Sequence, residues 1–160
     1  MKPDKTCIFP GTFNPFTVGH LDVVKRVAKL FDRIIIAVAE EGRPGMVPAA
    51  ERAKLVKKCV GGLANVSVIT FSGLLVELCK RENSRIVVRG LRSFNDLQYE
   101  STMLFFNKQF APEMETVYMI TSQEYSHISG SAVRDLIHLK ADITPFVPPE
   151  IKDDLLKLYK

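Results

Sequence analysis

The sequence predicts an α/β protein with a Rossmann-like, doubly wound sheet of five parallel strands and flanking helices. Five short runs rich in apolar and β-branched residues recur along the 160-residue chain, and each is followed by a segment with apolar residues at helical spacing. Strands that alternate with helices imply right-handed crossovers and therefore a parallel sheet. No repeat, low-complexity tract or linker interrupts the alternation, so we expect one domain over residues 1–160.

The first half of the chain supplies three strands, expected at Cys7–Phe9, Arg33–Ala39 and Val66–Phe71. The second strand is almost wholly apolar, as in a strand buried on both faces. Pro48 can open the second helix, and Ser72 is the expected cap of the third. The helices are predicted from apolar residues on one face: Leu21, Val24, Ala28 and Phe31 in the first, Leu55, Val56 and Cys59 in the second, and Leu74, Leu75, Leu78 and Cys79 in the third.

The second half continues the pattern with two more strands, expected at Arg85–Arg89 and Glu115–Thr121. Helices are expected from about 93 to 110, over 129–139 and, behind a proline-marked turn, over 148–159. The first of these has an apolar surface wider than one core-facing side requires, formed by Met103, Leu104, Phe105, Phe106 and Phe110.

Composition restricts the classes of function. Hydrophobic residues make up 46% and charged residues 25%, which is typical of soluble globular proteins, and no apolar run approaches the roughly 20 residues of a membrane span. The first residues resemble no signal peptide, so a cytoplasmic location is expected. The three cysteines are far apart and are expected to be buried, reduced thiols without zinc. A net charge of +4 permits an anionic ligand, but no basic stripe with interleaved aromatic residues indicates nucleic-acid binding.

A first constellation lies between the first strand and the following helix. Gly11 allows a tight turn, Thr12 offers a hydroxyl and an amide, and His20 lies where the helix begins. Because a helix N-terminus attracts phosphate, this segment is a candidate phosphate site. The alternative is that His20 is a surface or capping residue. The chain contains neither GxGxxG after this strand nor a P-loop motif, so a nucleotide would be held in another way.

Two further strand ends carry anion-binding residues. Arg89 and Arg92 flank a glycine turn after the fourth strand and suit bidentate phosphate contacts, although they could instead be surface residues paired to Asp96 or Glu100. After the fifth strand, two serines and an arginine stand at a predicted helix start, namely Ser129, Ser131 and Arg134. Helix capping alone would explain only one of the two serines. Carboxyl ends of parallel strands meet at one edge of a sheet, so we expect one shared site.

These motifs resemble those of the T/HxGH nucleotidyltransferase superfamily. The matching segments are GTFNP with TVGH at 11–20, RGLR at 89–92 and ISGSAVR at 128–134. Within the superfamily, their order and spacing over nearly the whole chain are similar to those of the bacterial phosphopantetheine adenylyltransferase family. The resemblance implies transfer of an adenylyl group from ATP to 4′-phosphopantetheine, giving dephospho-coenzyme A and pyrophosphate, with Mg²⁺ accompanying ATP and a homohexameric assembly.

The resemblance also implies roles for individual residues. The catalytic group would be Thr12, His20, Arg43 and Arg92, with His20 stabilising charge on the α-phosphate. The ATP site would comprise Thr12, Phe13, His20, Gly90, Leu91, Arg92, Glu100, Tyr125, Ser126, His127, Ile128, Ser129, Gly130 and Ser131. The pantetheine substrate would contact Thr12, Arg43, Leu75 and Arg89. The attacking group is already an ionised phosphate, so no general base is required.

The chain departs from the family pattern at two positions. Arg43 is the only cation in a loop where the family usually has a lysine, and a planar guanidinium meets a phosphate differently from an ammonium group. Gly130 stands where a serine is common, so it offers an amide but no hydroxyl. Two alternative functions remain open: a related transferase with another acceptor, such as nicotinamide mononucleotide or a cytidylyl acceptor, and a non-catalytic nucleotide- or RNA-binding module.

Overall fold

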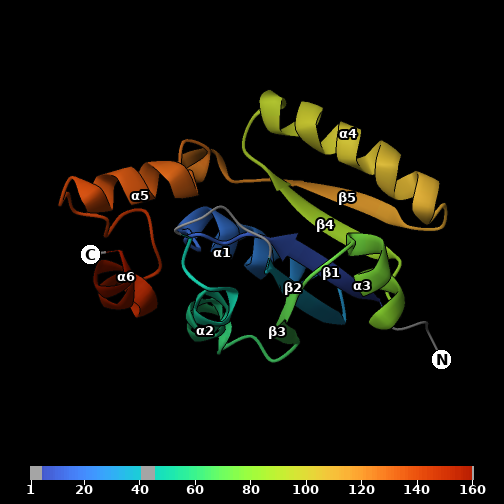
Figure 1. Ribbon diagram of the computed structural model, residues 1–160, viewed down its shortest axis with the longest axis horizontal. Coiled ribbons are helices and arrows are strands. Elements are labelled where there is room, and N and C mark those ends of the chain that lie inside the picture. The colour runs from blue at the N-terminus through green and yellow to red at the C-terminus, as the bar shows by residue number, and fades with distance from the viewer. Residues whose placement is uncertain (1–4, 41–45, 160) are drawn as a thin grey trace.

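A five-stranded, wholly parallel sheet forms the centre of the computed structural model, which describes residues 5–40 and 46–159 (Figure 1). The strands lie in the order β3-β2-β1-β4-β5, so the chain begins in the middle of the sheet and extends it in both directions. The predicted fold class is confirmed. The strands are β1 (Thr6–Gly11), β2 (Arg33–Ala39), β3 (Val66–Phe71), β4 (Ile86–Leu91) and β5 (Glu115–Ile120).

Helices connect the strands at the predicted places, with one correction. Ser72 does not cap the third helix: Leu74 is its N-cap residue, and Gly73, with a φ of +80°, separates Ser72 from the first turn. A short 3-10 turn over Gln123–Tyr125 was not predicted. The helices are α1 (Val18–Val27), α2 (Ala49–Val60), α3 (Leu75–Arg81), α4 (Phe94–Phe110), α5 (Gly130–His138) and α6 (Lys152–Leu158), the last preceded by a 3-10 turn over Pro149–Ile151.

The core has two layers because successive side chains of a strand point to opposite faces of the sheet. Cys7 and Phe9 of β1 join a core with the buried sides of α1, α2, α5 and α6, whereas Ile8 joins a second core with α3. Strand β2 is buried on both faces, as its apolar sequence predicts. The central strands are therefore fixed from both sides.

The cysteines belong largely to these cores. Cys7, Cys59 and Cys79 are free thiols, the first and last buried and Cys59 only partly so. Burial raises the pKa of Cys7 to about 12 and that of Cys79 to about 11, so both thiols are protonated at neutral pH. Within the described ranges, no helix combines the length and apolar character needed to cross a membrane.

The sheet order determines where the site forms. β1 lies beside β4, and β4 beside β5, so the three segments singled out in the sequence lie at neighbouring strand ends. The expected glycine turn after the fourth strand is corrected: Arg89, Gly90 and Leu91 are the last residues of β4, and only Arg92 follows the strand. In Figure 1, α5 (orange, left) lies beyond these ends, and α4 runs along β4 and β5 on the opposite side from α1. The fold thus brings all three constellations to one edge.

Candidate active site

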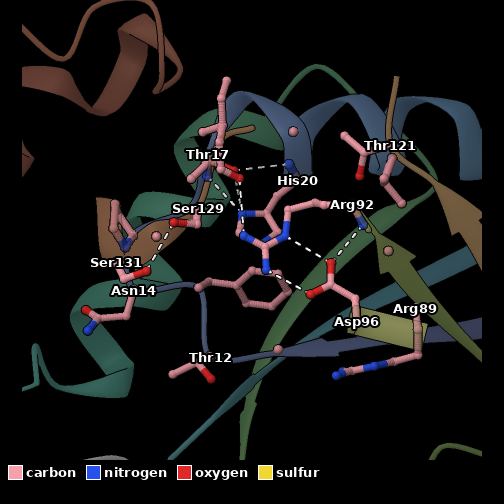
Figure 2. A pocket seen from close by; sticks show the side chains of 18 of the residues that line it. Thr12, Asn14, Thr17, His20, Arg89, Arg92, Asp96, Thr121, Ser129 and Ser131 are labelled. Carbon is pink, nitrogen blue, oxygen red and sulfur yellow. Dashed lines mark hydrogen bonds and ion pairs between the residues drawn. The ribbon is translucent and has the colours of Figure 1, made fainter. Parts of the chain in front are cut away.

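A cavity of about 720 Å³ opens at the carboxyl ends of β1, β4 and β5 (Figure 2). Its wall includes the loop after β1, the first turn of α1, the β4–α4 junction and the start of α5. The predicted site residues that line it are Thr12, Phe13, His20, Arg89, Gly90, Arg92, Glu100, Ile128, Ser129, Gly130 and Ser131.

Several residues of the predicted site are not part of this wall. The side chain of Leu91 is buried, and Tyr125 lies beside Gly19 and packs against the first core. The next two residues, Ser126 and His127, follow the 3-10 turn and do not line the cavity either. Leu75 lies on α3 and packs against the second core. Arg43 lies outside the described residues.

His20 is fixed by a capping box at the start of α1. The backbone amide of Thr17 donates to Nδ1 of His20 at 3.0 Å, and the Thr17 hydroxyl lies 2.9 Å from the same nitrogen. In return, the His20 amide donates to the Thr17 hydroxyl at 3.4 Å. Because Nδ1 accepts a hydrogen bond from the amide, the neutral ring carries its proton on Nε2. His20 is therefore both a capping residue, as the alternative interpretation held, and part of the cavity wall.

The surroundings of His20 disfavour its cationic form. Its ring packs between Phe13, edge-on at 5.2 Å between ring centres, and Phe16, stacked at 5.4 Å. Burial, together with the positive charges of Arg92 and Arg89, lowers the pKa of His20 from 6.5 to about 4. His20 is thus a neutral hydrogen-bond donor at neutral pH.

Two arginines of the β4–α4 junction are oriented by carboxylates of α4. Arg89 donates to both carboxylate oxygens of Glu100, through Nε at 2.8 Å and Nη2 at 2.5 Å, and to the Pro10 carbonyl at 2.7 Å. Arg92 donates to both oxygens of Asp96, at 3.2 and 3.1 Å. Figure 2 shows Asp96 below Arg92, with dashed lines that mark their hydrogen bonds.

These ion pairs are the ones that the surface-residue alternative anticipated, yet they lie in the wall of the cavity. Burial acts to raise the pKa of Asp96, but hydrogen bonds and charge from Arg92 outweigh it, so this pKa lies below its ordinary value. Each guanidinium has five N–H groups, and the contacts described above use only part of them, so both arginines retain donors for an anion.

The start of α5 forms another wall. The Ser129 hydroxyl accepts from the Ala132 amide at 3.1 Å and lies 3.1 Å from the Ser131 hydroxyl. Gly130 packs against the loop after β1: a Cβ atom at this position would lie 3.0 Å from the Asn14 carbonyl oxygen. A glycine at position 130, where a serine is common, thus allows the backbone of α5 to lie close to the backbone of Asn14.

Sequence reasoning missed two supporting residues. Thr17 stands three positions before His20, which is the spacing of a capping box, so the sequence contained its signal. Arg52 of α2 donates to the carbonyl of Thr12 although it is distant in sequence, and no local pattern identifies it. The resulting cavity combines a neutral imidazole donor, two oriented guanidinium groups and a helix N-terminus, which together suit a polyphosphate.

Fold and sequence comparisons define the class of protein. Residues 8–136 match the cytidylyltransferase-like family. The structure of a Vibrio parahaemolyticus protein described as a candidate nicotinate-nucleotide adenylyltransferase shares the fold. The two structures align with a TM-score of 0.73 and 20% sequence identity. The alignment covers 96% of this chain and 99% of the other.

Closer relatives narrow the class. The phosphopantetheine adenylyltransferase of Clostridium perfringens strain 13 is 42% identical, covering 92% of this chain and 91% of the relative. The enzyme of that name from Moorella thermoacetica is 40% identical, covering 97% of this chain and 98% of the relative. The chain therefore belongs to the phosphopantetheine adenylyltransferase family.

Proposed function

We propose that this chain transfers the adenylyl group of ATP to 4′-phosphopantetheine, producing dephospho-coenzyme A and pyrophosphate in coenzyme A biosynthesis. The observation that carries the proposal is family membership over nearly the full chain, together with a cavity whose donors suit polyphosphate. A phosphate oxygen of the acceptor bonds to the α-phosphorus of ATP as the bond to the β-phosphate oxygen breaks. Pyrophosphate leaves with that electron pair.

The proposed roles follow from the geometry of the side chains. His20 donates from Nε2 to an α-phosphate oxygen, because Thr17 occupies Nδ1. Arg92 balances the charge that develops on the phosphates, and Arg89 holds the acceptor phosphate. The attacking oxygen is ionised already, so positioning and electrostatic stabilisation account for the catalysis.

We further propose that Mg²⁺ accompanies the phosphates of ATP. The two carboxylates in the wall, Asp96 and Glu100, are held by Arg92 and Arg89. No three His, Cys, Asp or Glu side chains in residues 5–40 and 46–159 are grouped to hold a metal ion. The proposal therefore assigns the oxygen ligands of Mg²⁺ to the nucleotide, whose charge the ion offsets.

We also propose a cytoplasmic homohexamer. Helix α4 supports self-association because it has no buried residue and exposes several large apolar side chains: Phe94, Tyr99, Phe105, Phe106 and Phe110. A surface of this kind is typical of an interface between subunits.

The test of the activity is pyrophosphate release from ATP and Mg²⁺, with and without 4′-phosphopantetheine. Release should require the acceptor, and His20→Ala should lower the rate by about 100- to 1,000-fold because one transition-state donor is lost. His138→Ala, an exposed residue at the other end of α5, is the matched control and should keep the wild-type rate. Folded wild-type protein that releases pyrophosphate only with nicotinamide mononucleotide or a cytidylyl acceptor would contradict the proposed substrate.

A further inference from the structure

Arg52 is a buried cation of α2 that contacts the Thr12 carbonyl, and only 2% of its surface is exposed. Its guanidinium donates to three backbone carbonyls: Val47 at 2.7 Å, Ala39 at 2.9 Å and Thr12. Burying a guanidinium is costly unless its donors are hydrogen-bonded, and here each of its three nitrogens donates to a backbone oxygen. Burial lowers the pKa of Arg52, and the nearby Tyr159 acts in the opposite direction.

The three carbonyls belong to three different segments. Thr12 lies in the loop after β1, Ala39 is the last residue of β2, and Val47 precedes α2. One side chain of α2 therefore joins the central strands to the loop that lines the cavity. Of these contacts, the one to Thr12 reaches the proposed site, because Thr12 and Phe13 are both in the cavity wall.

The contact to Thr12 determines the orientation of a peptide unit. In a trans peptide bond the carbonyl and the next N–H point in opposite directions, and the Thr12–Phe13 bond is not among the cis bonds of the described chain. With the Thr12 carbonyl directed at Arg52, the Phe13 N–H points away from Arg52. Phe13 also has a φ of 49°, an uncommon conformation that surrounding contacts must maintain.

We propose that Arg52 is a positioning residue for adenylyl transfer: by holding the Thr12 carbonyl, it directs the Phe13 N–H into the cavity, where that group donates to a phosphate oxygen. The inference rests on the proposed function. Arg52 itself does not touch substrate. Its effect on catalysis is exerted through the backbone of Thr12 and Phe13.

The test compares Arg52→Lys with a control that loses similar contacts elsewhere. Lysine keeps the charge but lacks the planar fork needed to reach three carbonyls together. The control is Asn65→Ala. It removes a side chain that donates to the carbonyls of Ala28 and Phe31, both at 2.9 Å. Asn65 precedes β3, at the end of the sheet opposite the cavity. Thermal unfolding, kcat and both KM values are measured for each variant well below its Tm.

We expect Arg52→Lys to lower kcat by about 100-fold, the effect of misplacing a donor by about 1 Å, with less than about a threefold change in KM for ATP. Asn65→Ala should lower Tm but keep kcat within about twofold of the wild type. In Arg52→Ala, added ethylguanidine should restore part of kcat, whereas it should not accelerate Asn65→Ala. A folded Arg52→Lys enzyme with wild-type kcat, or equal losses in both variants, would overturn the inference. Inactive wild-type protein would instead contradict the proposed function.

Discussion

His20 illustrates how neighbouring groups set the chemistry of a single side chain. The Thr17 amide occupies Nδ1, so the ring proton resides on Nε2. The adjacent aromatic rings and arginines favour the neutral imidazole. A neutral donor can stabilise developing negative charge without a proton being transferred, which suits a reaction between phosphates.

The first prediction concerns the titration of His20 in the free protein. The chain has three histidines, so a His127→Gln/His138→Gln variant leaves one imidazole to observe by nitrogen NMR. With a pKa of about 4, the ring should stay neutral and protonated on Nε2 from about pH 5 to pH 8. A titration midpoint near 6.5, or a proton on Nδ1, would contradict the capping-box account.

The same shift predicts a dependence of stability on pH. Because the pKa of His20 is 6.5 ordinarily and about 4 in the folded protein, the unfolded chain binds more protons between these values. The contribution of His20 to the free energy of unfolding is therefore complete above about pH 6.5 and is lost as pH falls toward 4. Denaturant unfolding at several pH values should show a smaller acid loss in His20→Gln than in the wild type. Identical losses in the two proteins would contradict the prediction.

At the scale of elements, the sequence predicted strands and motifs better than contacts. The bounds of β2 and β3 were predicted to the residue, because each is a compact β-rich run with clear ends. The third helix was predicted to start too early, since the pattern did not reveal the left-handed backbone of Gly73. The sequence also predicted that one site would be shared by three segments: the loop after β1, the β4–α4 junction and the start of α5. Arg52 was missed because its partners are distant backbone carbonyls, which carry no sequence signature.

The next prediction concerns the contact between α5 and the loop after β1. In Gly130→Ala, the new Cβ would lie 3.0 Å from the Asn14 carbonyl oxygen, which also accepts from Arg134. Since this oxygen is held on both sides, overpacking should outweigh the gain in helix propensity and lower the free energy of unfolding by about 1 kcal/mol or more. Gly62→Ala is the control, because no atom beyond its own residue and its two chain neighbours lies within 4 Å of the added Cβ. The explanation fails if denaturant unfolding finds Gly130→Ala as stable as Gly62→Ala.

At the scale of the whole molecule, α4 is a long helix that a single chain leaves largely uncovered. Successive helical residues differ by about 100° around the axis, so Phe105 and Phe106 point in different directions, and both are largely exposed. A helix that is apolar on several sides is ordinarily buried. Its first turns also hold the carboxylates that orient Arg89 and Arg92, so covering α4 would stabilise part of the cavity wall.

The last prediction tests the proposed assembly. Phe106 is 50% exposed on α4, and Phe106→Glu would place a charge within the proposed interface, where its desolvation is unfavourable. Sedimentation analysis should give about six times the 18.0 kDa chain mass for the wild type and a smaller particle for the variant. Leu30→Glu, which changes a 59% exposed apolar residue that follows α1, should leave the mass unchanged. A monomeric wild type would refute the proposed hexamer. A Phe106→Glu variant that stays hexameric would exclude this face of α4 from the interface. The reason is that a buried, unpaired carboxylate there would prevent close packing of the subunits.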